Sequence, residues 1–334
     1  MKDRLYGKTL DELVACVKKY GLPAFSGKQI ADWLYKKHVD SIDNLTNLSK
    51  KAREILVANC EIGVSPPSDV KISADGTKKY LYTLPTGQAV EAVYIPDNDR
   101  ATLCISSQAG CRMACRFCMT GRQGLKANLS AGDILNQIRS LPERNSLTNI
   151  VYMGMGEPLD NIDEVLKSLE ILTSEYGYEK SHKRITVSTI GIDGLQRFLQ
   201  ASKCRLAISL HSPFDEERQQ LVPMQKFYPV ADTLDIIKKD EYLRRISFEY
   251  IMFAGVNDSE KHARALVRMF GGGNYRINLI RFHKISDSDL SPSSPETMEI
   301  FKNYLNARGV LATIRASRGE DIFAACGMLH HRVN

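Results

Sequence analysis

Apolar and polar residues follow two different periods along this chain. In residues 10–17, 30–34 and 48–56, apolar side chains recur at the i, i+3, i+4 and i+7 spacing of amphipathic helices. From residue 102 onward, short apolar runs alternate with amphipathic stretches of helical length. These runs are TLCIS, NIVYMGM, RITVST, RLAISL, ISFEYIM, INLIRF and VLATIRA. Strand and helix repeated in this order predict an α/β fold with a parallel sheet closed or partly closed into a barrel.

The two periods divide the chain into four parts. Residues 1–60 are expected to form a small helical accessory domain that binds RNA. Residues 61–96 contain the linker VSPPSDV and two β-rich runs separated by Pro-Thr-Gly, which predict a β-hairpin. Residues 97–320 are expected to form the barrel and residues 321–334 a C-terminal segment. In such barrels the reacting groups lie at the carboxyl ends of the strands.

Composition indicates a folded cytoplasmic protein. Of its 334 residues, 43% are hydrophobic and 25% charged, and no low-complexity run is present. The start of the chain lacks an apolar core of a signal peptide, and no stretch approaches the roughly 18 apolar residues of a membrane span. In a reducing compartment, eight cysteines indicate metal binding, catalysis or packing rather than a disulfide framework. A transient catalytic disulfide is still allowed.

The charge pattern is compatible with a nucleic-acid partner. The net charge of +6 is mild, but residues 1–60 hold 11 Lys and Arg against 7 Asp and Glu. Lysine pairs recur there at residues 18–19, 36–37 and 50–51. The alternative interpretation is that these lysines form the solvated faces of helices.

Three cysteines lie close together in CRMACRFC, directly after a predicted strand. Cys111, Cys115 and Cys118 have a spacing that suits zinc or an iron–sulfur cluster. A structural zinc site needs four ligands, yet the sequence has no second CxxC pair and the next histidine along the chain is His182. Zinc would therefore need Cys104 or a distant residue, and a chance grouping is the third possibility.

The Cx3Cx2C spacing resembles the signature of the radical S-adenosylmethionine (SAM) enzymes. The resemblance implies a partial (β/α)6-type radical SAM barrel and one [4Fe-4S] cluster held by the three cysteines, whose fourth iron binds SAM. Phe117 resembles the aromatic position of this motif. The resemblance further assigns SAM contacts to the GMGEP turn and to residues that end predicted strands. These are Gly156, Glu157, Ser188, Ser209, Leu210 and His211. Without the resemblance, the turn would be a plain Gly-Pro turn and the histidine structural.

Over nearly its full length the chain resembles the RlmN family of dual-specificity ribosomal RNA methyltransferases and, more distantly, the resistance methyltransferase Cfr. The matching segments are VEAVYIP, RATLCISSQAGCRMACRFCMTG, YMGMGEPL, ITVSTIGI, SLHSP, YIMFAGVNDS, NLIRFH and SRGEDIFAACG. One departure is His283 in NLIRFH, where the family usually has an asparagine that contacts SAM. We expect this histidine to bind SAM in its place, as a hydrogen-bond donor.

The chemistry of the substrate explains why the family needs two further cysteines. C2 of adenine is an electrophilic carbon without a lone pair, so it cannot displace the methyl group of SAM directly. The resemblance implies that one SAM methylates Cys326, that a second SAM supplies the radical, and that the methyl carbon then adds to C2. It assigns proton removal from C2 to Glu91 and release of the adduct to Cys104, which ends in a disulfide with Cys326. On the residues alone, both cysteines could simply pack and Glu91 could face solvent.

Two other functions stay open at this point. A Cfr-like enzyme would methylate C8, although RATLC and SRGED favour C2. A non-catalytic iron–sulfur protein that binds RNA would need no methyl group on Cys326. The expected partners are 23S ribosomal RNA, transfer RNA and a flavodoxin-like electron donor, and we expect a monomer with no membrane contact. Cys16, Cys60 and Cys204 are interpreted as packing residues without partners.

Overall fold

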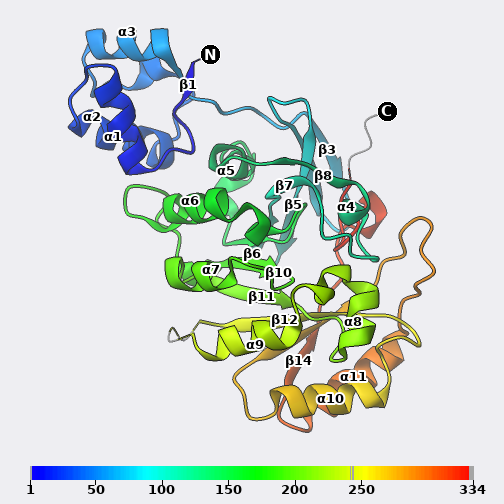
Figure 1. Cartoon of the computed structure of the whole chain (residues 1–334). Coiled ribbons are helices and arrows are strands. Elements are labelled where there is room, and N and C mark those ends of the chain that lie inside the picture. The colour runs from blue at the N-terminus through cyan, green and yellow to red at the C-terminus, as the bar shows by residue number, and fades with distance from the viewer. Residues whose placement is uncertain (1, 241, 243, 331–334) are drawn as a thin grey trace.

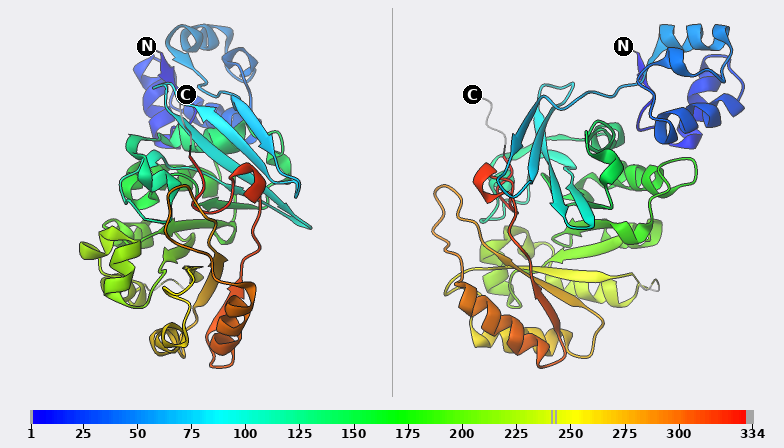
Figure 2. Two further views of the ribbon diagram at one scale, coloured as in Figure 1. Left: turned by 90° about the vertical axis from the view of Figure 1, so that its right-hand side faces the viewer. Right: turned by 180° about the vertical axis from the view of Figure 1, so that it is seen from behind.

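The computed structural model describes residues 2–240, 242 and 244–330. It contains a group of N-terminal helices, a ten-stranded sheet and helices along the sheet (Figure 1). The N-terminal helices and the C-terminal segment lie on different sides of the molecule (Figure 2). The predicted α/β barrel with N-terminal helices and a hairpin is confirmed. None of the helices in the described part of the chain has the length and apolar content needed to cross a bilayer.

The N-terminal helices begin at capping residues. The elements here are β1 (Asp3–Arg4), α1 (Leu10–Lys19), α2 (Phe25–Ala31), the π-helical turn η1 (Asp32–Lys36), η2 (Ile42–Asn44), α3 (Lys50–Asn59) and β2 (Cys60–Glu61). Thr9 and Glu12 form a capping box, because each side chain accepts a hydrogen bond from the other residue's backbone N–H. Ser49 caps α3 through Ala52 N. All three expected amphipathic segments overlap helices, although residues 30–34 continue from α2 into the π-helical turn.

These helices dock on the barrel through a very close backbone contact. Gly7 lies against Gly132 of α5 (Ala131–Arg139), where a Cβ on Gly7 would be 2.3 Å from Gly132 Cα. Beside this contact, Arg4 Nη1 pairs with Asp133 Oδ1 at 2.8 Å. The N-terminal part is therefore fixed to the barrel and is not joined to it by the linker alone.

The main sheet combines a parallel and an antiparallel half. Its strand order is β14-β13-β12-β11-β10-β9-β6-β5-β4-β3. The parallel strands are β6 (Arg100–Cys104), β9 (Asn149–Tyr152), β10 (Ile185–Thr189), β11 (Arg205–Ser209), β12 (Ile246–Met252), β13 (Arg276–Arg281) and β14 (Leu311–Ile314). All seven expected strands are present. Strands that follow one another in the chain are neighbours in the sheet, except that β7 and β8, between β6 and β9, form a separate sheet.

The antiparallel half is the predicted hairpin with one more strand. It consists of β3 (Asp69–Ile72), β4 (Lys78–Thr83) and β5 (Ala89–Asp97), and β5 joins it to β6. The apolar pattern of the sequence did not predict β3, nor a separate two-stranded sheet made of β7 (Gln108–Cys111) and β8 (Gly124–Asn128). This small sheet encloses the cysteine motif.

Helices connect the parallel strands and cover their outer face. They are α5, α6 (Ile162–Thr173), α7 (Leu195–Ala201), α8 (Asp215–Leu221), α9 (Val230–Lys238), α10 (Glu260–Phe270) and α11 (Pro295–Asn306). The short helix α4 (Met119–Arg122) instead lies beside the small sheet of β7 and β8. Short 3-10 turns precede or follow several of them, namely η3 (Arg144–Ser146), η4 (Pro158–Asn161), η5 (His182–Arg184), η6 (Pro223–Lys226) and η7 (Glu320–Ile322). Alternate strand residues point outward onto these helices. For example, the ring centroids of Phe248 and Phe270 are 4.3 Å apart.

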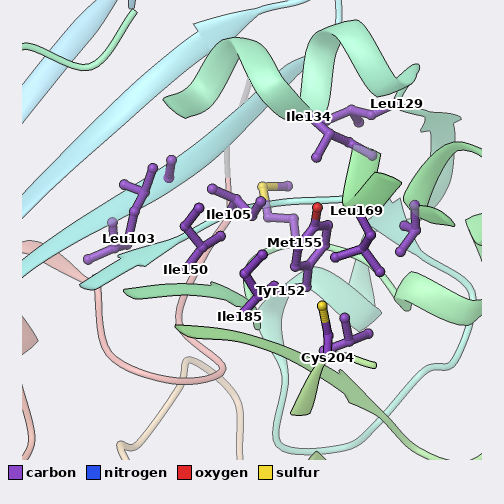
Figure 3. Close-up of a cluster of buried hydrophobic side chains, with 14 of the residues drawn as sticks. Leu103, Ile105, Leu129, Ile134, Ile150, Tyr152, Met155, Leu169, Ile185 and Cys204 are labelled. Atoms are coloured by element: carbon purple, nitrogen blue, oxygen red, sulfur yellow. The ribbon is translucent and has the colours of Figure 1, made fainter. Parts of the chain in front are cut away.

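The core between the first parallel strands and α5 and α6 is apolar and fully buried. Figure 3 shows Ile150, Tyr152 and Ile185 from the sheet facing Ile134 and Leu169 from these helices. Burial of each such side chain stabilises the fold by about 1.5–3 kcal/mol.

The three cysteines outside the motifs are buried, as expected of packing residues, but they do have neighbours. Cys204 lies in the core of Figure 3, with Sγ 3.8 Å from His182 Nδ1. Burial and the nearby Cys16 raise the pKa of Cys60 to about 12. The expectation that these cysteines lack partners is therefore wrong.

Candidate active site

The cysteine motif forms a loop between β7 and α4, which we call the cluster loop (residues 111–118). Cys111 ends β7 and is 7% exposed, Cys115 is 8% exposed, and Cys118 is partly buried and directly precedes α4. Cys118 N donates to Cys115 O, and Arg116 N donates to Leu221 O of α8. These bonds fix the loop against the carboxyl ends of the strands.

Two of the three thiols of the cluster loop have raised pKa values. Burial, followed by the other cysteines, raises the pKa of Cys115, and burial, Glu157 and Cys118 raise that of Cys111 to about 12. Thiolates gathered in this way need a cation to stabilise them. Within the described residues, no three His, Cys, Asp or Glu side chains converge on one metal position. In an iron–sulfur cluster each cysteine binds a different iron, so the three thiols do not have to converge on one point.

Phe117 connects the cluster loop to the predicted SAM contact His211. The two ring centroids are 4.6 Å apart with an edge-on geometry. His211 is buried, and its Nδ1 accepts a hydrogen bond from Ile251 N at 3.1 Å. Burial, assisted by Arg218, lowers the pKa of His211 to about 3, so the ring is neutral and its proton is on Nε2. His211 is therefore prepared to donate one hydrogen bond from Nε2.

The GMGEP turn packs tightly beside the cluster loop. A Cβ on Gly154 would lie 2.7 Å from Ile105 O, and one on Gly156, whose φ is +102°, would lie 2.6 Å from Gln108 Cβ. Only glycine allows this approach. Glu157 is buried and accepts from Leu159 N and Ile190 N. Burial raises the pKa of Glu157 to about 7.

Two residues that the sequence analysis missed hold the strand ends in position. Arg218 of α8 is fully buried and donates to three backbone carbonyls, those of Ile190, Ser209 and Leu210. Asn257 is also fully buried, and its Nδ2 donates to His211 O at 2.6 Å. The only sequence signal for Asn257 was its place in YIMFAGVNDS, and none of the quoted motifs includes Arg218.

Two further strand-end residues, Ser188 and Ser209, lie on the inner face of the sheet. Ser188 and Ser209 are partly exposed, whereas Leu210 is buried. Ser209 is in register with Glu249 of β12, which accepts a hydrogen bond from Asn278 of β13 at 2.7 Å. A polar row thus crosses the inner face at the level of the predicted SAM contacts.

His283 follows β13 and faces the C-terminal segment. It is 4% exposed, and its Nδ1 lies 3.2 Å from Glu320 Oε1 without hydrogen-bond geometry. Its expected contact with SAM stays a prediction.

Cys326 lies in residues 319–330, which we call the C-terminal loop. Two hydrogen bonds, both 2.7 Å, join this loop to α4, which directly follows the cluster loop. Met119 N donates to Gly327 O, and Thr120 Oγ1 donates to Leu329 O. A Cβ on Gly327, whose φ is +81°, would lie 2.8 Å from Phe117 O. Glycine after Cys326 is therefore required by the contact with the cluster loop.

The other side of the C-terminal loop is bound by the hairpin. Glu91 Oε1 pairs with Lys79 Nζ at 3.0 Å, and Glu91 Oε2 accepts from His330 N at 2.9 Å. Lys79 Nζ also donates to Phe323 O at 3.1 Å. Both charged side chains are only 7% exposed. The alternative that Glu91 faces solvent is therefore wrong.

Cys104 and Cys326 are both free thiols in the same neighbourhood. Burial and, less strongly, a charge on Cys326 raise the pKa of Cys104 to about 12, although a backbone hydrogen bond with Met153 and the charge of Arg315 oppose this rise. Burial also raises the pKa of Cys326, although its side chain is exposed to solvent. Cys326 is thus exposed to solvent and yet surrounded by enough protein atoms to raise its pKa. A position in a recess of the surface accounts for both observations.

A cavity of about 590 Å³ opens beside the cluster loop. It lies between the turn of the hairpin, the small sheet and α4. Its lining includes Ala89, Gly110, Met119, Arg122 and His330. Open space thus adjoins the segments that carry Glu91, Cys111 and Cys118.

Comparisons with known proteins agree with this geometry. The model described as the radical SAM superfamily matches residues 105–267, and that of the ribosomal RNA large subunit methyltransferase N-terminal domain matches residues 4–62. A Parabacteroides distasonis protein named probable dual-specificity RNA methyltransferase RlmN is 57% identical over 331 residues, 98% of this chain and 96% of that protein. The dual-specificity RNA methyltransferase RlmN of Bdellovibrio bacteriovorus is 40% identical over 97% of this chain and 83% of its own length.

A solved structure supports the same relationship. The crystal structure of a radical SAM methyltransferase from Sphaerobacter thermophilus superimposes with a TM-score of 0.91 at 37% identity. The match covers 98% of this chain and 99% of that one. On sequence and on structure alike, the chain belongs to the RlmN family of radical SAM methyltransferases.

Proposed function

We propose that this enzyme methylates C2 of an adenosine in 23S ribosomal RNA through a methyl group carried on Cys326. The observation that supports this most directly is the hydrogen bond from Met119 N to Gly327 O at 2.7 Å. Cys118 directly precedes the donor and Cys326 directly precedes the acceptor. A bond between these two positions keeps the proposed methyl carrier next to the loop where the radical is generated.

The family implies SAM and a [4Fe-4S] cluster as cofactors. We assign the cluster to Cys111, Cys115 and Cys118. We assign SAM to the inner ends of the strands, at Gly156, Glu157, Ser188, Ser209, Leu210, His211 and His283. When bound, these groups supply a 5′-deoxyadenosyl radical and, from a second SAM, the methyl group. His211 would donate from Nε2 because its Nδ1 is already occupied by Ile251 N.

The residues of this chain then perform the transfer. The methyl group on Cys326 loses a hydrogen atom to the 5′-deoxyadenosyl radical, and its carbon forms a bond to C2 of adenine. Glu91 takes the proton from C2, and the unpaired electron of the adduct would pass back to the iron–sulfur cluster. The Cys104 thiolate attacks the sulfur of Cys326, so the bond from sulfur to carbon breaks and a disulfide remains. The electron pair of the broken bond stays on carbon, which takes up a proton and becomes the methyl group. Because the pKa of Cys104 is about 12, this attack needs a nearby cation, and Arg315 is suited to that role.

Anaerobic incubation with SAM, a reductant and unmodified 23S ribosomal RNA tests the proposal. Mass spectrometry of the nucleosides should detect 2-methyladenosine. Finding 8-methyladenosine instead would indicate the Cfr-like reaction. Absence of S-methylcysteine at Cys326 in purified protein would favour a non-catalytic RNA-binding role.

Further parts of the proposal concern partners and domains. We propose that transfer RNA is a second substrate, since the relatives are named dual-specificity RNA methyltransferases. We also propose that the enzyme acts as a cytoplasmic monomer with a flavodoxin-like electron donor. Size-exclusion chromatography with light scattering tests the monomer, and reduction of the cluster by purified flavodoxin tests the donor.

We propose the same domain division as above, with residues 1–60 binding RNA, 61–96 as linker and hairpin, 97–320 as barrel and 321–334 as catalytic segment. Of the lysines paired along the N-terminal part, Lys36 and Lys37 form ion pairs with Glu179 and Asp32. Lys50 and Lys51 are exposed at the start of α3. Replacing these two by glutamine should therefore weaken RNA binding more than replacing Lys36 and Lys37.

A further inference from the structure

Arginines gather at the amino ends of four consecutive strands of the barrel. Arg205 and Arg276 are the first residues of β11 and β13, and Arg184 and Arg245 directly precede β10 and β12. The hydrogen bonds between the strands make these arginines neighbours. Leu206, which directly follows Arg205, donates from its backbone N to Arg245 O. Arg205 is also in register with a β10 residue, and Arg276 with a β12 residue. We call these four residues the arginine layer.

The alternation of the strands turns this layer toward the inside of the barrel. Phe248 and Tyr250 of β12 contact aromatic rings on α10 and α11, so they point outward. Glu249 between them points inward, where it accepts a hydrogen bond from Asn278. Arg276 lies two residues before Asn278 on the same strand, and therefore on the same face.

The positive charges of the layer are close enough to oppose one another. Burial lowers the pKa of Arg205, and so do the charges of the other three arginines. Burial also lowers the pKa of Arg276, and its Nε is buried without a hydrogen-bond partner. Such a group of like charges is unfavourable unless an anion is bound to it.

Carboxylates of the described residues do not neutralise the layer. None of them forms an ion pair with the four guanidinium groups. Asp240, close to Arg245 in sequence, is already bound to Arg244 at 2.5 Å. Glu241 lies outside the described residues, so we assign the unneutralised charge to Arg184, Arg205 and Arg276 and not to Arg245.

We propose that the arginine layer binds the phosphate backbone of the RNA substrate. This inference rests on the proposed function, because it assumes that a long polyanion is the substrate. Guanidinium groups bind phosphate through two parallel hydrogen bonds, and four of them on adjacent strands offer a row of such sites.

An acidic electron donor fits this surface less well than RNA. The donor has to approach the cluster loop, which follows the carboxyl-end side of β6, whereas the arginine layer lies at the amino ends. A strand of about five residues separates the two levels by roughly 17 Å. RNA is long enough to contact both levels at once.

The test compares two double variants that each remove two positive charges. R205Q/R276Q changes the layer, and R264Q/R308Q changes arginines on and after the outer helices α10 and α11. Binding of a labelled, unmodified 23S ribosomal RNA fragment is measured by fluorescence anisotropy at several salt concentrations. We expect R205Q/R276Q to raise Kd about tenfold at low salt and to reduce the slope of log Kd against log salt by about 1.5 to 2. The control should change Kd less than about twofold.

Two further measurements separate binding from folding. Removing like charges should leave the thermal midpoint of R205Q/R276Q unchanged or raise it. R205K/R276K keeps the charges, so it should retain the salt slope while losing part of the affinity, because lysine lacks the planar fork. SAM cleavage without RNA should be equal in all variants.

The outcomes distinguish this inference from the proposed function. Wild-type Kd and salt slope in R205Q/R276Q would overturn the inference, even if the wild type methylates RNA. Slower reduction by flavodoxin in the same variant, with unchanged RNA binding, would make the layer a docking site for the donor instead. Layer-dependent binding without any methylated product in the wild type would retain the inference and overturn the proposed function.

Discussion

The cluster loop and the C-terminal loop both carry cysteines of the proposed reaction, but the protein holds them differently. Cys111 and Cys115 are buried, and Phe117 between the cysteines packs on His211. Cys326 is exposed, although hydrogen bonds bind its loop to α4 on one side and to the hairpin on the other. A metal cluster needs ligands at fixed positions, whereas a methyl carrier has to reach more than one partner.

The tethers of the C-terminal loop limit how far Cys326 can move. Lys79 holds Phe323 O and Met119 holds Gly327 O, so only three residues separate the two bonded positions. The proposed reaction requires Cys326 to reach SAM first and Cys104 afterwards. Only residues 324–326 are free of these two bonds, so a larger motion of the loop has to break them.

Of all the changes considered, loss of one cluster cysteine should reduce activity most. If it did not, the difference between the fixed cluster loop and the C-terminal loop would not hold. We expect C115A to lose the brown iron–sulfur chromophore and all SAM cleavage, because no other thiol of the loop can replace this ligand. C326A is the matched control and should retain both. Iron analysis and 5′-deoxyadenosine assays check this. A colourless, zinc-containing C115A protein with full activity would contradict the cluster assignment.

The two catalytic cysteines should fail at different stages. In C326A no methyl group is loaded, so RNA should stay free and unmodified. In C104A the methyl carbon still adds to C2, but the thiolate that releases the adduct is missing, so protein should accumulate covalently attached to RNA. Denaturing gels with and without ribonuclease measure this. Turnover of C104A like the wild type would show that its assigned role is wrong.

The pH dependence of the free energy of unfolding should differ between a carboxylate buried near the cluster loop and one exposed in the C-terminal loop. The pKa of Glu157 is about 7 in the folded protein against an ordinary value of 4.5. A raised folded-state pKa stabilises the protein fully below pH 4.5, and this contribution is lost as the pH rises through about 7. The change is on the order of 3 kcal/mol.

The variant E157Q cannot titrate at this position. We therefore expect its free energy of unfolding to fall less than that of the wild type between pH 4.5 and 7, as measured by chemical denaturation of the apoprotein. E320Q, which changes an exposed carboxylate in the C-terminal loop, should follow the wild-type profile. Parallel profiles for E157Q and the wild type would exclude a protonated Glu157.

The smallest effect concerns the contact between the two loops. In G327A, the positive φ and the close approach of Phe117 O should lower the free energy of unfolding by about 1–3 kcal/mol. Gly309 has a similar φ of +78° but open space around it, so G309A should cost about 1 kcal/mol. Thermal denaturation of both variants measures the difference. Equal losses would mean that the contact itself contributes nothing.

The sequence predicted the strands well because each has an apolar run bounded by polar residues. It missed β7 and β8 because their residues, QAGC and GLKAN, are short and weakly apolar. Local pattern carries no information about such a pair, because the cysteine motif separates the two strands in the sequence.

Sequence motifs predicted the residues of the candidate site, but they did not predict the residues that hold these in position. Arg218 and Asn257 bind backbone carbonyls of strands that are distant in sequence, and such contacts follow from the fold rather than from spacing. Burial of Glu91 depends on Lys79 across the hairpin and on His330 at the other end of the chain. No periodicity joins these three residues.

The bond between Met119 and Gly327 has a consequence for how the enzyme matures. The cluster loop leaves the ribosome roughly 200 residues before Gly327, which corresponds to about 10–40 s at bacterial rates of synthesis. During this interval the C-terminal loop cannot yet cover the cluster loop, and assembly factors have access to the three thiols. We expect iron and sulfide to enter stalled nascent chains that end before residue 319 faster than the complete apoprotein, with incorporation of labelled iron as the measurement. Equal rates would mean that the C-terminal loop leaves the thiols open.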